Sequence, residues 1–99
     1  MRVIKEGHIY ELDNFDNPEG KQTITFLYKK SKPDNPTELE LVFDGTTNEE
    51  VIEMLIHRLA FLYEKLPDVN TFYAMKYCIS ALEALEKRTK ERKERGVVS

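Results

Sequence analysis

Residues 37–50 read TELELVFDGTTNEE, and this stretch decides the fold because it passes from a strand pattern to a helix pattern. Between residues 39 and 43, apolar side chains recur at every second position, as in a half-buried strand. Asp44 and Gly45 end that strand. Thr47 is followed three residues later by Glu50, which matches a capping box at the start of a helix. We therefore expect strands before about residue 46 and helices after it.

Two segments upstream also carry strand patterns. Residues 22–28 alternate threonine with larger apolar side chains, and residues 3–12 form a weaker strand. The turns at residues 17–20 and 33–36 are rich in proline, asparagine and aspartate, which favour tight turns. The simplest arrangement is a three-stranded antiparallel meander.

Downstream, apolar residues recur at helical spacing in two segments joined by a short connection at Pro67. Asp68 or Asn70 can cap the second helix, which we expect to end near Arg95, before Gly96. The short connection predicts an antiparallel helical hairpin. The predicted apolar stripes are Ile52, Leu55, Leu59, Leu62 and Leu66 in the first helix, and Phe72, Met75, Ile79 and Leu82 in the second.

These patterns predict an α+β fold, with an N-terminal antiparallel β-meander followed by an antiparallel two-helix hairpin. We expect a single domain over residues 1–99, divided into a β-sheet region at 1–45 and a helical hairpin at 46–96. A domain of this size buries a small share of its surface, so oligomerisation would stabilise it.

The composition, with 40% hydrophobic and 33% charged residues, is typical of a soluble globular protein. The sequence has no apolar run of membrane-spanning length and no signal peptide at its start, and its single cysteine, Cys78, can form no internal disulfide. We expect a cytoplasmic protein. The net charge of −3 argues against a general nucleic-acid binder.

Basic residues are concentrated near the C-terminus. Arg88, Arg92 and Arg95 are spaced by four and three, so they share one face of the second helix. The planar guanidinium group matches the oxygens of phosphates, which makes this row a candidate anion site. Alternatively, cations at a helix C-terminus stabilise the helix dipole, and Glu91 and Glu94 can pair with them on a solvated tail. The residues alone leave both interpretations open.

Other chemistry is weakly supported. His8 and His57 have no neighbouring ligands at metal spacing, and no base is placed to activate Cys78. Tyr73 and Tyr77 suit either stacking on a base or packing against a partner helix. We therefore expect no enzyme activity, no cofactor and no metal.

Several segments together resemble the Thoeris anti-defense sponge family carried by phages. The resemblance lies in residues 14–26 (NFDNPEGKQTITF), 45–51 (GTTNEEV), 55–59 (LIHRL) and 81–97, where the shared residues include Leu85 to Thr89, Arg92 and Arg95. The matches are in register across nearly the whole chain. Between residues 67 and 81 the chain departs from the family pattern, and Thr71 stands where the resemblance leads us to expect asparagine.

The resemblance implies a protein that sequesters glycocyclic ADP-ribose immune signals made by TIR-domain proteins and does not cleave them. Some members also bind cyclic oligonucleotides, and members assemble into dimers and hexamers. The ligand-binding residues that the resemblance and the chemistry suggest are Arg58, Arg88, Arg92 and Arg95, with Phe15 or Phe72 stacking on adenine and Thr71 beside them. An alternative function is an adaptor that uses its helical hairpin to inhibit a host defense protein.

Overall fold

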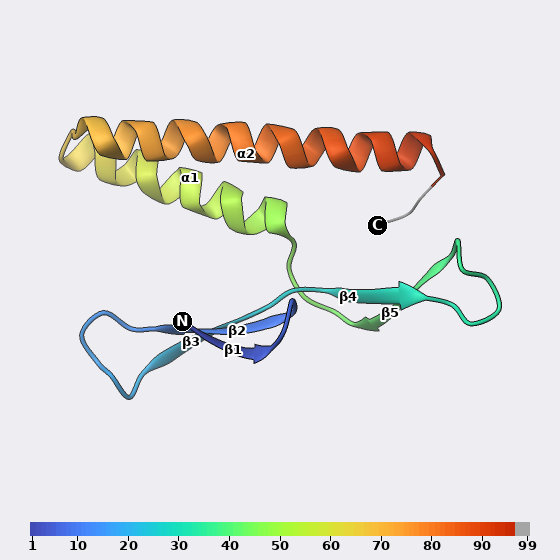
Figure 1. Cartoon of the computed structure of the whole chain (residues 1–99). Coiled ribbons are helices and arrows are strands. Elements are labelled where there is room, and N and C mark those ends of the chain that lie inside the picture. Colours follow the sequence, from blue (N-terminus) through green and yellow to red (C-terminus); the bar gives the residue numbers. More distant parts are fainter. Residues whose placement is uncertain (97–99) are drawn as a thin grey trace. The chain divides into compact units, whose positions relative to one another are not determined.

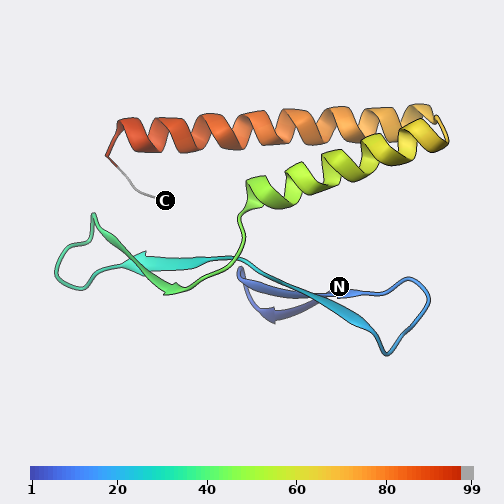
Figure 2. The same ribbon diagram turned by 180° about the vertical axis from the view of Figure 1, so that it is seen from behind.

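The computed structural model describes residues 1–96 and has an α+β fold, as the sequence predicts. It divides into two compact units, Met1–Thr47 and a second that begins at Asn48 (Figures 1 and 2). The expectation of a single domain stays a prediction. The elements are β1 (Arg2–Lys5), β2 (Ile9–Asp13), β3 (Lys21–Thr25), β4 (Tyr28–Ser31), β5 (Leu39–Phe43), α1 (Asn48–Lys65) and α2 (Val69–Glu94).

The first unit contains five antiparallel strands in two small sheets. The predicted antiparallel β-meander is confirmed, whereas the expected number of three strands is wrong. One sheet has the order β1-β2-β3, and the other pairs β4 with β5. The predicted strand at 3–12 is interrupted by a turn at Gly7, which has a φ of 80°. The predicted strand at 22–28 is interrupted at Leu27, whose N–H donates to the carbonyl of Thr46 at 3.0 Å. A regular alternation in the sequence is thus interrupted where the chain turns or where a backbone group bonds to a distant segment.

Aromatic side chains join the two sheets of this unit. His8 stacks on Tyr28 with ring centroids 4.0 Å apart, and the edge of Phe43 meets both rings. Gly45 lies where a Cβ atom would fall 2.5 Å from the carbonyl oxygen of Thr25, so glycine is required there. The β-region is therefore held by a small aromatic cluster and one close backbone contact.

The second unit is the predicted antiparallel hairpin of α1 and α2. The Asp68 carboxylate caps α2 and accepts hydrogen bonds from the N–H groups of Asn70 and Thr71 at 2.7 and 3.4 Å. Gly96 follows the C-cap residue Arg95 with a φ of 79°, a left-handed conformation that suits glycine. Both predicted ends of the second helix are confirmed.

The seam between the helices is narrower than the predicted stripes. Half-buried residues alternate at spacings of four and three, as in a two-stranded coiled coil. They are Ile52, Ile56, Leu59 and Tyr63 on α1, and Thr71, Met75, Cys78, Leu82 and Leu85 on α2. Val51 and Ala60 on α1 are also half-buried but lie outside this spacing.

Several residues of the predicted stripes lie outside this seam. Leu55 and Leu62 on α1 are 40% and 38% exposed, and Phe72 and Ile79 on α2 are 40% and 38% exposed. The stripes were wrong at these positions because one helix covers only one narrow side of its partner. The side chains that flank the seam are therefore only partly covered within the hairpin.

None of the residues in the described part of the chain is fully buried. Two helices form a single layer, and a stable core normally requires two layers packed face to face. The hairpin therefore leaves apolar side chains exposed on both flanks of its seam.

Candidate functional site

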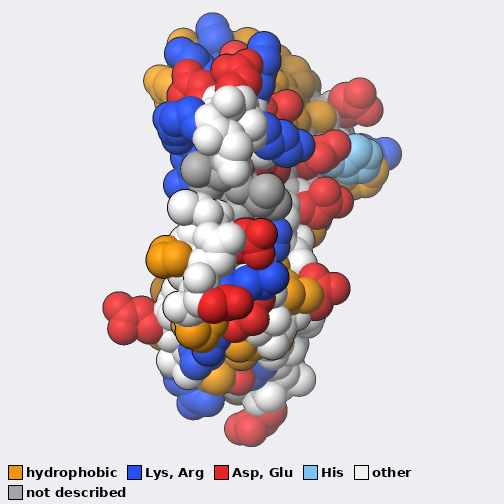
Figure 3. Space-filling view, turned by 90° about the vertical axis from the view of Figure 1, so that its right-hand side faces the viewer, with side chains coloured by type: hydrophobic (Ala, Val, Ile, Leu, Met, Phe, Trp, Pro, Cys, Tyr) orange, Lys and Arg blue, Asp and Glu red, His pale blue; other side chains and the backbone are white. Residues whose placement is uncertain are grey.

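The predicted arginine row lies in the last turns of α2. Arg88 and Arg95 are exposed, and Arg92 is half-buried because it continues the 4-3 spacing of the seam after Leu85 and Thr89. Figure 3 shows this end of the helix, where basic side chains gather with acidic ones among them. The row is thus anchored on one side and open to solvent on the other.

The arginines of this row have no acidic partners. Across residues 1–96, ion pairs such as Lys21 with Asp13 and Lys32 with Glu38 lie in the first unit, and none is formed by Arg88, Arg92, Arg95 or Arg58. Pairing of the row with Glu91 or Glu94, which the alternative interpretation suggests, is not formed. The guanidinium groups are therefore free to bind an external anion.

Arg58 lies apart from this row, exposed on α1. Tyr63 contacts Phe72 near the connection, and Glu49 shares a hollow with Glu86 at the other end of the hairpin. These two contacts set the register of the antiparallel helices, so Arg58 on α1 lies opposite residues near 77 on α2. The helical rise then puts Arg88 about 15 Å farther along α2. One copy of the hairpin does not bring Arg58 and Arg88 to the same phosphate group.

The aromatic candidates lie elsewhere again. Phe15 belongs to the first unit, in the loop between β2 and β3, and is 105% exposed. Hydrogen bonds hold this loop, with Asn17 Oδ1 accepting from the Glu19 N–H at 3.0 Å. Phe72 and Thr71 lie in the first turn of α2, about 24 Å along the helix from Arg88. The predicted residues are therefore not gathered into one pocket by a single helical hairpin.

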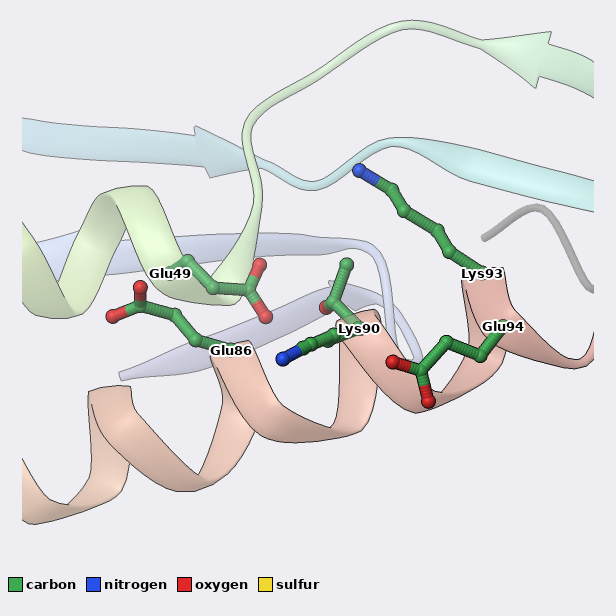
Figure 4. A pocket seen from close by; sticks show the side chains of 6 residues that line it. Glu49, Glu86, Lys90, Lys93 and Glu94 are labelled. Atoms are coloured by element: carbon green, nitrogen blue, oxygen red, sulfur yellow. The ribbon is translucent and has the colours of Figure 1, made fainter.

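A hollow of about 550 Å³ lies between the start of α1 and the last turns of α2. Its lining is Glu49, Glu86, Thr89, Lys90, Lys93 and Glu94. In Figure 4 the Lys90 side chain turns toward Glu49 and Glu86, whereas Lys93 extends away from α2. One carboxylate oxygen of Glu49 is buried without a hydrogen-bond partner.

This hollow was missed by the sequence reasoning. The sequence does contain a signal for it. Glu49 and Thr89 continue the 4-3 spacing of the seam on α1 and α2, but they are polar, whereas apolar residues at these positions would pack the two helices together. At about 100° per residue, Lys90 and Glu94 lie on the opposite side of α2 from Arg88 and Arg95. Three carboxylates against two ammonium groups also make the hollow a poor phosphate site, so the arginine row remains the candidate anion site.

Other features of the structure add no further chemistry to this site. In the described part of the chain, no group of three or more His, Cys, Asp and Glu side chains is placed to hold a metal ion. Within residues 1–96, neither α1 nor α2 is long and apolar enough to cross a membrane.

The chain was compared with protein-family models, curated proteins and solved structures, and none of them matches it. The features of this chain that bear on its function are therefore the arginine row and the exposed apolar surfaces.

Proposed function

We propose that this chain is a phage anti-defense sponge, which binds a cyclic ADP-ribose-type immune signal in the host cytoplasm and holds it uncleaved. The observation that supports this most directly is the unpaired arginine row of α2. Arg88, Arg92 and Arg95 offer guanidinium N–H donors from one helix face, which suit the two phosphates of such a signal. The resemblance of the sequence to the sponge family names the ligand class, and cyclic oligonucleotides are further candidates.

The proposed sponge works as a homo-oligomer, a dimer or a hexamer. Two observations support this: no described residue is fully buried, and the arginines and aromatics of the proposed site lie far apart within one hairpin. A signal with a pyrophosphate and an adenine needs both kinds of side chain at once. A second copy can supply the aromatic ring, and the fully exposed Phe15 is the best placed to reach into a neighbour.

The first experiment is thermal unfolding with a panel of glycocyclic ADP-ribose isomers and cyclic di- and trinucleotides. A ligand that binds only the folded protein, at about 100 times its Kd, stabilises it by about 2.7 kcal/mol and raises Tm. We expect one signal to raise Tm and to be recovered chemically intact after denaturation. Consumption of the ligand would instead indicate an enzyme.

The control is a lysine change on the other side of α2. Arg88→Ala and Arg92→Ala should abolish the ligand-induced rise in Tm, whereas Lys90→Ala, which removes a charge from the opposite side of the same helix, should preserve it. A similar loss in all three variants would mean that general positive charge binds the ligand, and the arginine row would not be a defined site.

One observation favours a second function, an adaptor that binds a host defense protein through the hairpin. Leu55 and Leu62 are exposed beside the seam, and exposed apolar patches are common at protein interfaces. The adaptor function would gain if Leu55→Asp abolished inhibition of the defense system while Arg88→Ala and Arg92→Ala left it unchanged.

A further inference from the structure

One side of α1 carries an exposed apolar stripe with charges at its ends and at its centre. Met54 and Phe61 are 55% and 52% exposed, and the Lys65 ammonium group lies over the Phe61 ring at 5.4 Å. At about 100° per residue, the stripe falls within roughly 100° of the helix circumference. Its residues are Glu50, Met54, His57, Arg58, Phe61 and Lys65.

This stripe has a symmetric order along the helix. Met54 and Phe61 are equally distant in sequence from the midpoint between His57 and Arg58, and so are Glu50 and Lys65. A two-fold axis through that midpoint would set an antiparallel copy of α1 against the first. Each apolar residue would then meet the apolar residue of the other kind, and Glu50 would meet Lys65.

The charges favour a second copy of α1 in the antiparallel direction. In a parallel pair, Glu50 would face Glu50 and Lys65 would face Lys65, with repulsion at both ends. In the antiparallel pair, opposite charges meet twice because a two-fold interface repeats every contact. A self-complementary surface of this kind fits a second copy of the same chain.

We propose that α1 packs antiparallel against α1 of a second copy, and that the two Arg58 side chains meet at the axis and form a shared anion site. This inference deepens the proposed function, on which it rests for the need to assemble and for the anionic ligand. Two guanidinium groups side by side repel each other until an anion lies between them. The site therefore takes a phosphate or pyrophosphate group and couples ligand binding to assembly.

Disulfide cross-linking tests the antiparallel packing. In a Cys78→Ser background, purified Met54→Cys and Phe61→Cys chains are mixed and oxidised under mild conditions. We expect a mixed disulfide dimer, and far less of a dimer from either variant alone, because Met54 lies away from the Met54 of the second copy. Lys76→Cys on the exposed side of α2 is the matched control and should give no dimer above background.

Two outcomes would overturn the packing. If Met54→Cys alone cross-links as well as the mixture does, the helices pair in parallel. If the mixture gives no cross-linked dimer, α1 does not pack against a second α1. Circular dichroism of each cysteine variant must show the helical content of the parent chain, so that a failure to cross-link is not a failure to fold.

Inorganic pyrophosphate tests the anion site, with sodium chloride at matched ionic strength as the control for screening. Pyrophosphate should raise the yield of the mixed dimer. Arg58→Gln should raise the yield without pyrophosphate, since the repulsion is gone, and should remove the response to it. A full pyrophosphate response in Arg58→Gln would overturn the shared site. No nucleotide is used, so this result is independent of whether the arginine row binds an immune signal.

Discussion

At the scale of single residues, Asp13 at the end of β2 shows how an exposed charge is tuned by its neighbours. A hydrogen bond from Lys21 Nζ at 2.7 Å and the charge of that ammonium group hold the pKa of the Asp13 carboxyl below its ordinary value. The charge of the N-terminal amine, 3.6 Å away, acts in the same direction. Because the pKa is lower in the folded chain, this pair stabilises the fold at neutral pH. The contribution is lost as the pH falls through the folded pKa.

We predict that Lys21→Met raises the pKa of Asp13 toward its ordinary value, as measured by NMR titration of the side-chain carboxyl. The Asp13 side chain is 62% exposed, so salt should weaken the effect in the unmodified chain. Lys32→Met is the matched control, because Lys32 pairs with Glu38 in the β4–β5 hairpin and makes no contact with Asp13. An unchanged Asp13 pKa in Lys21→Met would show that Lys21 is not the cause.

At the scale of elements, the two helices are defined by their ends and by a single seam. Pro67 ends α1 because it has no N–H and disfavours a helical conformation at the residue before it, and Asp68 then caps the free N–H groups of α2. The seam then carries half-buried residues at 4-3 spacing, up to the polar positions Glu49 and Thr89. The hairpin is thus closed by apolar contacts near the connection and open near the arginine row.

We predict that Asp68→Ala lowers the free energy of unfolding by about 1 kcal/mol, because two N–H groups lose their acceptor. Urea unfolding followed by circular dichroism measures this change. Asp68→Asn should preserve most of the stability, since asparagine is an equally good N-cap residue. If both substitutions destabilise the chain equally, the loss comes from the charge of Asp68 and not from capping.

At the scale of the whole molecule, the chain has exposed apolar side chains and no fully buried ones among residues 1–96. The hydrophobic effect stabilises a fold in proportion to the apolar area that leaves water, so one copy alone gains little. Assembly of several copies would bury the flanks of the seam and the outer stripe of α1. Folding and assembly should then be coupled, so that the subunits are most stable when assembled.

We predict that Tm rises with protein concentration, because subunits that bind one another only when folded stabilise the fold by mass action. Differential scanning calorimetry across a wide range of concentrations, together with sedimentation equilibrium, measures both quantities. Phe61→Glu should lower Tm at high concentration and flatten this dependence, whereas Tyr77→Glu on the exposed side of α2 should not. A Tm that is independent of concentration would contradict the prediction.

Much of the fold follows from the sequence because its decisive patterns are local. The alternation in residues 37–43, the turn residues at 17–20 and the end of α2 at Gly96 each act through neighbouring backbone and solvent, so they are readable one segment at a time. The division of 22–28 into two strands was not readable, because it depends on a hydrogen bond from Leu27 to the distant Thr46.

The candidate site was only partly determined by the sequence. Helical periodicity by itself places Arg88, Arg92 and Arg95 on one face, since that spacing is a property of any helix. Only the tertiary structure decided that Arg92 is half-buried in the seam, that Arg58 lies far along the hairpin, and that Leu55 and Phe72 are exposed. The physical reason is that periodicity fixes the direction of a side chain on its own helix, whereas burial depends on what the neighbouring helix covers.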